Sequence, residues 1–184
     1  MVKIPGLLLL TILVCGAWLS AAMAASAGER ELLRYTQTHD MIASGDFPVL
    51  QVFDSGRVRV HLPAWQKNAG DYEYFLSDAE FKALKERLEN PSVSGFDKAA
   101  LERDLHAAEA AARAGDGLLF AISDNTYTHM VLDQGVNAPA KDIAWTNLQN
   151  DARRHSGLRA LAELAETERF LQKLLHHSQM NRLD

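Results

Sequence analysis

The chain has 184 residues, of which 47% are hydrophobic, 8% aromatic and 23% charged. These values are typical of a globular protein and argue against disordered, collagen-like and polytopic membrane chains. Its 19 Lys and Arg against 24 Asp and Glu give a formal net charge of -5, so no general positive field is available to hold nucleic acid or anionic lipid. We therefore expect no nucleic-acid partner.

Residues 1–24 are predicted to be a secretory signal peptide. Lys3 precedes the apolar run of residues 6–14, and small residues follow as far as Ala27. This is the order of charged, apolar and cleavage regions in an export signal. The small-x-small rule allows cleavage after Ala24 or after Ala27, and we favour Ala24.

The alternative interpretation of this segment is an uncleaved membrane anchor. Residues 4–25 carry no charge and are long enough to cross a bilayer as a helix. The small residues at its end favour cleavage, and with it a periplasmic or secreted protein without a stable membrane span. Cys15 is the only cysteine, so residues 25–184 would form one cysteine-free domain, with neither disulfides nor thiol chemistry.

Strand patterns come first in this domain. Residues 31–40 suit a strand that runs into a loop. Residues 49–53 and 57–62 flank a short connection whose Gly56 can supply the positive φ of a hairpin. Residues 71–76 also suit a strand, in which successive side chains point to opposite faces. One face would carry Tyr72, Tyr74 and Leu76, and the other Glu73 and Phe75.

Two helices are expected next. Ser77 and Glu80 form a capping box that opens the first, and Asn90-Pro91 ends it. After a Ser/Gly linker over residues 92–95, Asp97 is the expected N-cap of the second. The buried stripe of this second helix would be Ala-rich and consist of Leu101, Leu105, Ala108 and Ala112.

The rest of the chain reverts to strands and then helices. Residues 118–123 and 126–132 are predicted to form a second hairpin around Asp124-Asn125, and the breaker-rich residues 133–140 a loop. A short strand is expected at residues 143–145, a short helix at 147–154 and a long one at 158–175, while residues 176–184 are expected to fray. The inward face of the long helix would be Leu161, Leu164, Ala165, Leu171, Leu174 and Leu175.

This order predicts the α+β class: an antiparallel sheet built from hairpins, with helices packed on one face and a long C-terminal helix.

Two sets of side chains suggest metal chemistry. Glu102, His106 and Glu109 lie at i, i+4 and i+7 of the second helix, but the further ligands that a zinc or di-iron centre needs are not evident. Histidine and methionine also lie near one another three times, a ligand pair that copper accepts: His39 with Met41, His129 with Met130, and His176 and His177 with Met180. Solvated ion pairs and surface histidines are the favoured interpretation of both sets, so we expect no cofactor.

Catalytic motifs are scarce. Ser123, Asp124 and His129 could suggest a nucleophile with its base, but they lie at one predicted turn and strand without a glycine-framed elbow. The sequence contains neither a Walker loop, a dinucleotide glycine fingerprint nor a His-Glu-x-x-His motif. We expect a non-catalytic protein, with a small hydrolase as one alternative.

One strand face combines cationic and aromatic side chains. Arg57, Arg59 and His61 share the polar face of their predicted strand, and Trp65 follows shortly after. Arg, Tyr and Trp are enriched where proteins recognise one another. These four residues are therefore the candidate protein-binding face, the competing interpretation being a solvated sheet face with its aromatic residues buried behind it.

The succession of a strand, a hairpin closing at residues 54–60, a further strand and a helix opened by residues 76–80 resembles small bacterial protease-inhibitor domains of the emfourin type. The likeness is one of architecture over about 55 residues, and it carries over no functional residue. It implies partner binding. The Ala-rich second helix and the long C-terminal helix depart from a minimal domain of that kind.

The sequence therefore predicts an exported, non-catalytic protein that engages another periplasmic or secreted protein, as an inhibitor or assembly factor, through the strand face and the loop over residues 133–142. The alternative hypothesis from a different class is a periplasmic protein that handles copper or zinc.

Overall fold

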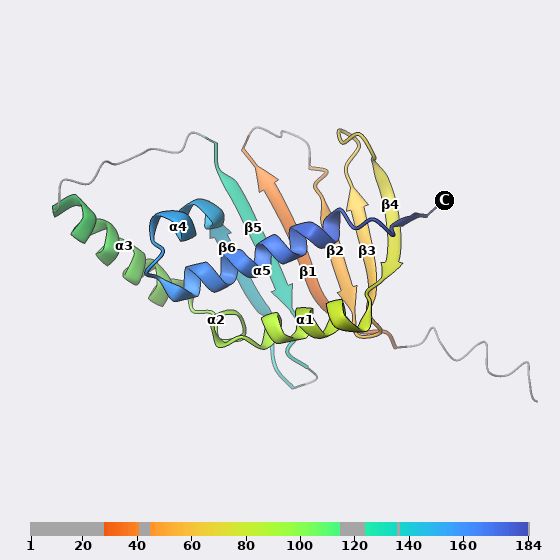
Figure 1. The fold of residues 1–184 in the computed structure, drawn as a ribbon, viewed down its shortest axis with the longest axis horizontal. Coiled ribbons are helices and arrows are strands. Elements are labelled where there is room, and N and C mark those ends of the chain that lie inside the picture. The colour runs from red at the N-terminus through yellow and green to blue at the C-terminus, as the bar shows by residue number, and fades with distance from the viewer. Residues whose placement is uncertain (1–27, 41–44, 115–123, 136, 184) are drawn as a thin grey trace, which may run out of the picture. The chain divides into compact units, whose positions relative to one another are not determined.

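Antiparallel strands form one sheet in the computed structural model, which describes residues 28–40, 45–114, 124–135 and 137–183. The chain divides into residues 1–30 and a unit of residues 31–184, and the sheet belongs to the second. Its strands are β1 (Glu31–His39), β2 (Val49–Phe53), β3 (Arg57–Leu62), β4 (Gly70–Phe75), β5 (Thr126–Leu132), β6 (Lys141–Thr146) and β7 (Asn181–Arg182). Their order is β6-β5-β1-β2-β3-β4-β7 (Figure 1).

The first hairpin is confirmed at the predicted residues. Val52 of β2 lies opposite Val58 of β3, and the turn between them is closed by the Gly56 amide, which donates to the Phe53 carbonyl at 3.0 Å. Gly56 has a φ of 81°, a value that a residue with a side chain adopts only with strain. The glycine thus sets the register that places alternate residues of both strands on the helix-covered face.

The second predicted hairpin differs from the structure. β5 pairs with β1 on one side and with β6 on the other, while residues 118–123, the other strand of the predicted hairpin, lie outside the described residues. The hairpin partner of β5 is β6, and the expected short strand at residues 143–145 is the centre of β6. The breaker-rich segment 133–140 is the connection between them.

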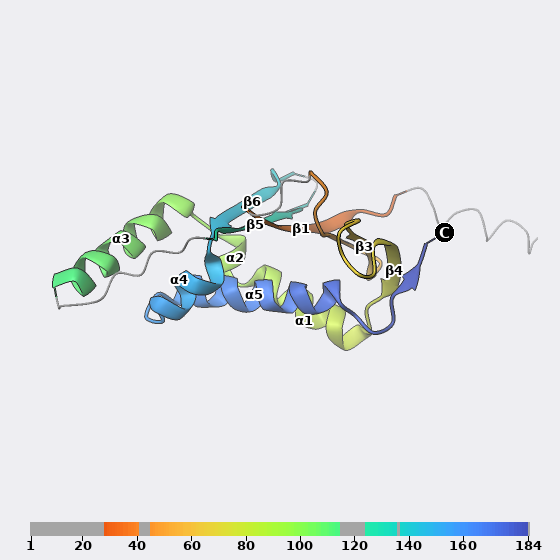
Figure 2. The same cartoon turned by 90° about the horizontal axis from the view of Figure 1, so that it is seen from above.

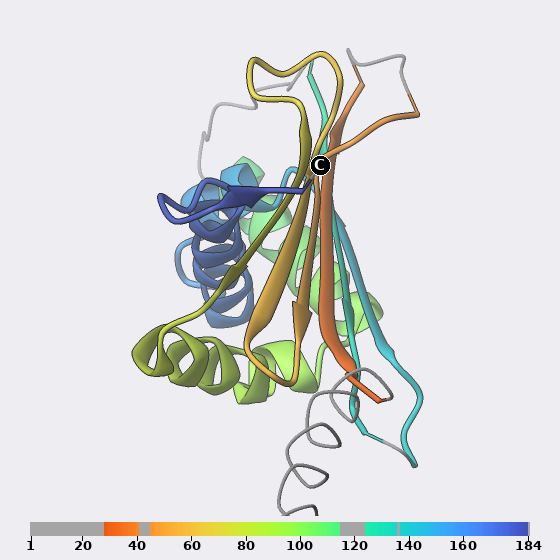
Figure 3. The same ribbon diagram turned by 90° about the vertical axis from the view of Figure 1, so that its right-hand side faces the viewer.

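Helices cover a single face of this sheet. They are α1 (Asp78–Glu89), α2 (Pro91–Ser94), α3 (Lys98–Ala114), α4 (Leu148–Arg154) and α5 (Arg159–Leu175), and α1, α4 and α5 lie together on one side of the strands (Figures 2 and 3). The predicted α+β class, antiparallel sheet and long C-terminal helix are confirmed. Among the described residues, none of the helices is both long and apolar enough to cross a bilayer.

The core lies between α5 and the inner face of the sheet. All six leucines and alanines predicted to face inward on α5 are buried. They belong to one core with inward side chains of the sheet that are fully or almost fully buried: Leu33, Tyr35, Leu50, Val52, Val58, Val60, Met130 and Ile143. The capping box of α1 is also present, since the Glu80 amide donates to Ser77 Oγ at 3.3 Å and the Ser77 amide donates to Glu80 Oε2 at 2.9 Å.

Helix α3 is less embedded than its pattern predicts. Asp97 caps it as expected, accepting from the Ala100 amide at 3.0 Å, but only Leu101 and Leu105 are buried and Ala112 is exposed. The helix continues past the β6 edge of the sheet (Figures 1 and 2), where its later turns have no sheet beneath them. The linker expected just before it contains the short helix α2.

The C-terminal segment differs from the expected frayed tail. The His177 ring stacks on Tyr74, with centroids 4.4 Å apart and planes 4° apart, and His177 Nε2 lies 3.1 Å from Glu80 Oε1. Beyond it β7 pairs with β4, and the Leu183 amide donates to the Asp71 carbonyl at 2.8 Å. The segment is ordered because it covers the edge of β4.

Candidate protein-binding face

The sheet face opposite the helices, called the outer face here, is not covered by any helix or strand of the described residues (Figure 3). Because side chains alternate along a strand, the partners of the buried residues point to this side. On strands β2 to β6 the outer face carries mixed charged, aromatic and small side chains, including Gln51, Phe53, Arg57, Arg59, His61, Asp71, Glu73, Phe75, Tyr127, His129 and Asp142.

Two of the predicted residues meet at one end of the outer face. Arg57 Nη1 lies 2.7 Å from Glu73 Oε2, and Arg59 Nε lies 3.4 Å from the same oxygen. The Arg57 guanidinium also stands 4.3 Å from the centre of the Phe53 ring. The hydrogen bond from Arg57, and then that from Arg59, lowers the pKa of Glu73. Arg57 is therefore held in one orientation by an ion pair and an aromatic face.

Phe75 is the site residue that the sequence analysis did not select. It lies directly across from Arg57 on the neighbouring strand, and 60% of its surface is exposed. The period-2 pattern held the signal, because it set Phe75 on the face opposite Tyr72 and Tyr74. Tyr74 is buried in the core and Tyr72 packs against it. Phe75 is thus the aromatic residue that β4 exposes on the outer face.

The other two predicted residues lie at the far end of β3. His61 Nδ1 is 2.8 Å from Asp71 Oδ1 and its Nε2 is 2.7 Å from Asp46 Oδ1. Trp65 is 47% exposed, and its Nε1 donates to the Asp46 carbonyl at 3.1 Å. The predicted set is therefore divided in two: Arg57 and Arg59 lie with Phe75, and His61 and Trp65 lie with Asp46.

The two aspartates make the stability of this second cluster depend on pH. The hydrogen bonds to Asp71 and then Asp46 raise the pKa of His61 above its usual 6.5. A raised folded pKa gives stabilisation that is fully present below about pH 6.5 and is lost as the pH rises through the folded pKa. At the acid end the Ala64 amide and then His61 lower the pKa of Asp46.

We expect the free energy of unfolding to decline as the pH rises above about 6.5 and through the raised folded pKa of His61, and His61→Gln to flatten that decline. Urea unfolding at several pH values measures it. An unchanged pH dependence in His61→Gln would show that the raised pKa of His61 is not linked to folding. The effect should be modest, because the His61 side chain is 39% exposed to solvent.

The loop over residues 133–142 lies at the Arg57 end of the sheet. One row of residues crosses the sheet from β5 to β4, and each member lies opposite the next: Leu132, Leu33, Val52, Val58 and Tyr74. β4 and β5 run in the same direction across these antiparallel pairings. The loop that follows Leu132 therefore lies at the same end of the sheet as Phe75, the residue after Tyr74. Arg57 and the loop over residues 133–142, two parts of the predicted binding surface, thus lie at the same end of the sheet.

The proposed metal sets are not brought together as sites. Glu102 and Glu109 lie in ion pairs along α3 with Lys98 and Arg113, at 3.7 Å each, and His106 is exposed between them. In the described part of the chain, no three His, Cys, Asp or Glu side chains are grouped so as to hold a metal ion.

The histidine and methionine pairs are separated in a similar way. His129 and Met130 point to opposite faces of β5, since His129 lies on the outer face 3.0 Å from Asp142 and Met130 is in the core. His176 is exposed, and its neighbour His177 is engaged with Glu80. Met41 and Ser123 lie outside the described residues, so neither the first pair nor the predicted nucleophile has a described position.

A buried polar cluster on the inner side of the sheet was also missed. Glu168 of α5 is fully buried. Its hydrogen-bond donors among the described residues are all neutral: Gln37 at 3.2 Å, Gln149 at 2.6 Å, Tyr35 at 3.5 Å and the Thr128 hydroxyl. Burial, and then the charge of Glu168, raise the pKa of Tyr35. No periodic signal marked Glu168, because it occupies a core position of the helix despite being charged.

The sequence matches no family model and no curated protein. The likeness to emfourin-type domains stays one of element order. That face is a sheet surface with fixed charges and exposed aromatic rings, which is suited to contact with another protein surface.

Proposed function

We propose that this protein is an exported, non-catalytic binding protein that engages another periplasmic or secreted protein through the outer face, as an inhibitor or assembly factor. The carrying observation is the position of Phe75, which is 60% exposed beside an arginine that is already held in place. Export itself is inferred from the signal-like residues 1–24.

The chemistry of the Arg57 end supports this proposal. Binding hot spots are enriched in aromatic residues and arginine that become buried at the centre of an interface. Phe75 lies across the strands from Arg57, and the Arg57 guanidinium stands over the Phe53 ring. The Arg57 side chain is only 17% exposed. Little side-chain entropy remains to be lost there on binding, because the guanidinium is already fixed.

Exposed apolar side chains support it as well. Of the large hydrophobic residues that the structure describes, the markedly exposed ones are Trp65, Phe75, Tyr127 and Leu183. Phe75 and Tyr127 lie on the outer face, and Trp65 lies on the loop between two of its strands. A partner with an apolar recess for Phe75 and an acidic group for Arg59 would match the Arg57 end.

Phe75→Ala is expected to weaken binding of such a partner by at least tenfold, since truncating a hot-spot aromatic residue typically costs about 2 kcal/mol or more. The partner would be captured with the purified protein from an extract of exported proteins, and its affinity measured by calorimetry. Stability should change by less than about 0.5 kcal/mol, because the side chain is mostly exposed.

Charge reversal provides the matched comparison. Arg59→Glu on the outer face should weaken binding, whereas Lys82→Glu on α1 should not, because Lys82 is equally cationic, is 79% exposed and lies on the helix side. A captured partner that binds Phe75→Ala and Arg59→Glu as tightly as the unmodified protein would overturn the assignment of the outer face. Recovery of no partner would count against a protein-binding function.

A further inference from the structure

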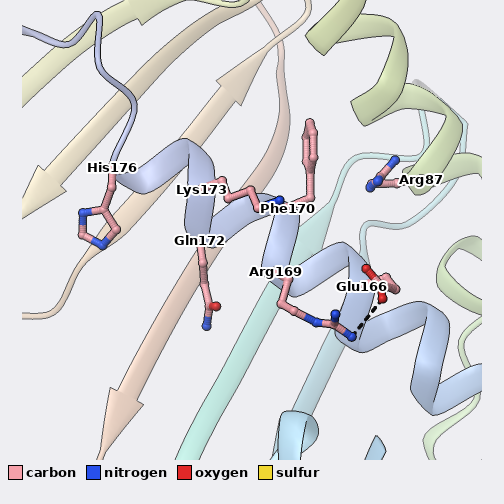
Figure 4. Close-up of a pocket in the computed structure, with 7 residues that line it drawn as sticks. All are labelled: Arg87, Glu166, Arg169, Phe170, Gln172, Lys173 and His176. Carbon is pink, nitrogen blue, oxygen red and sulfur yellow. Dashed lines mark ion pairs between the residues drawn. The ribbon is translucent and has the colours of Figure 1, made fainter. Parts of the chain in front are cut away.

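Two adjoining hollows lie between α1 and α5, in the helix layer and away from the outer face. The larger has a volume of about 560 Å³ and is lined by Arg87, Glu166, Arg169, Phe170, Gln172, Lys173 and His176 (Figure 4). The smaller, of about 350 Å³, shares Arg87 and Glu166 with it. Together they form a groove whose wall on one side is α1 and on the other α5.

The larger hollow is cationic in a chain whose net charge is -5. Arg87, Arg169 and Lys173 are permanently charged, and against them stands one carboxylate, Glu166. Glu166 lies 2.9 Å from Arg169 Nη2, which leaves a surplus of positive charge at the other two. Such a concentration of one sign in a concave place attracts ligands of the opposite sign.

Arg87 adds an observation that points to a missing acceptor. Its Nη1 donates to the Ala83 carbonyl at 3.4 Å, and its guanidinium stands 4.6 Å from the Phe170 ring centre. Its Nε, however, is buried and has no hydrogen-bond partner within the described residues. Buried donors in proteins almost always have a partner, so the protein itself satisfies this guanidinium only in part.

The smaller hollow limits what the ligand can be. Besides the shared residues it is lined by Glu86, Glu163, Asn90 and Thr167, so it adds carboxylates and no further cation. A second negative group on the ligand would be repelled there. Phe170, in contact with Arg87, offers an apolar surface to the rest of the ligand.

We propose that the larger hollow binds a small organic anion, whose single carboxylate or phosphate group is held by Arg87, Arg169 and Lys173 and whose apolar part lies against Phe170. The guanidinium groups supply paired donors suited to the planar carboxylate and to phosphate oxygens. This site lies on a different layer from the outer face, and it does not depend on the proposed protein partner.

Titration of the purified protein with benzoate and with phenyl phosphate, followed by amide chemical shifts in NMR, tests the proposal and separates the two anion types. We expect saturable binding of at least one probe, with the shifts confined to residues near Arg87 and Lys173. The double variant Arg169→Gln/Lys173→Gln should bind at least tenfold more weakly. Glu166→Gln should bind a few-fold more tightly, because it removes the carboxylate of the larger hollow.

Arg159→Gln is the matched control, since Arg159 belongs to the same helix, is 88% exposed and does not line the larger hollow. Its affinity should equal that of the unmodified protein. The proposal is overturned if neither probe saturates at concentrations of about 10 mM, if the double variant binds unchanged, or if inorganic phosphate binds as tightly as phenyl phosphate, because Phe170 would then contribute nothing.

Discussion

Glu168→Ala is expected to lower the free energy of unfolding by about 3 kcal/mol. The substitution removes the acceptor of four donors inside the protein, which come from Tyr35, Gln37, Thr128 and Gln149. Each buried donor left without a partner costs about 1–3 kcal/mol, while the loss of a buried charge returns part of this. Urea denaturation followed by circular dichroism measures the change.

Two further variants define the cause of that loss. Glu168→Gln should cost less than Glu168→Ala, because the hydroxyls of Tyr35 and Thr128 can rotate to donate to the amide oxygen or accept from its nitrogen. Glu166→Ala, two residues away and on the solvent side with 57% exposure, should change stability by less than about 0.5 kcal/mol. A Glu168→Ala protein as stable as Glu166→Ala would contradict the proposed role of the cluster.

Tyr74→Ala is expected to destabilise the fold by about 3–5 kcal/mol, as for other large buried aromatic residues. The ring is 3% exposed, its hydroxyl donates to the Leu174 carbonyl at 2.7 Å, and His177 stacks on it. Its loss would open a cavity between β4 and the end of α5. It would also remove the surface on which the C-terminal segment rests.

Tyr74→Phe separates the ring from the hydroxyl. It keeps the cavity filled and the surface for His177, so we expect a loss of only about 1 kcal/mol, from the missing hydrogen bond. Hydrogen exchange gives a second readout: the Leu183 amide, bonded to Asp71, should lose protection in Tyr74→Ala beyond the global loss of stability and keep it in Tyr74→Phe. Equal protection in both variants would show that the segment is held without Tyr74.

Local signals were sufficient to predict most of the fold. The hairpin at Gly56, the capping box at Ser77 and the apolar stripe of α5 depend on neighbouring residues, whose spacing directly reflects the period of a strand or a helix. The bounds of β2 and β3 are those expected. The error at β5 arose because residues 118–123 and the residues of β6 both follow strand patterns, and pairing partners across a sheet are not a local property.

The remaining features depend on tertiary contacts. The residues next to Glu168 in the sequence do not indicate that it is buried, because its four donors come from β1, β5 and α4. The C-terminal segment is polar, and its order comes from Tyr74 and the uncovered edge of β4, which lie about 100 residues earlier in the chain. Phe75 could have been selected from the period-2 pattern. The fixed orientation of Arg57 could not be predicted, because it depends on where Phe53 and Glu73 lie.

The central place of β1 has a consequence for how the chain folds. β1 pairs with β2, which follows it closely, and with β5, which begins almost ninety residues after β1 ends. The meander of β1 to β4 can form as it emerges, but one edge of β1 and the part of the inner surface that α5 covers stay open until β5, β6 and α5 arrive. Such long-range pairing slows folding and prolongs the lifetime of an intermediate with exposed apolar surface. A chain that loses its last third would retain the residues of the β1 to β4 meander without β5, β6 and α5, and would become prone to aggregation.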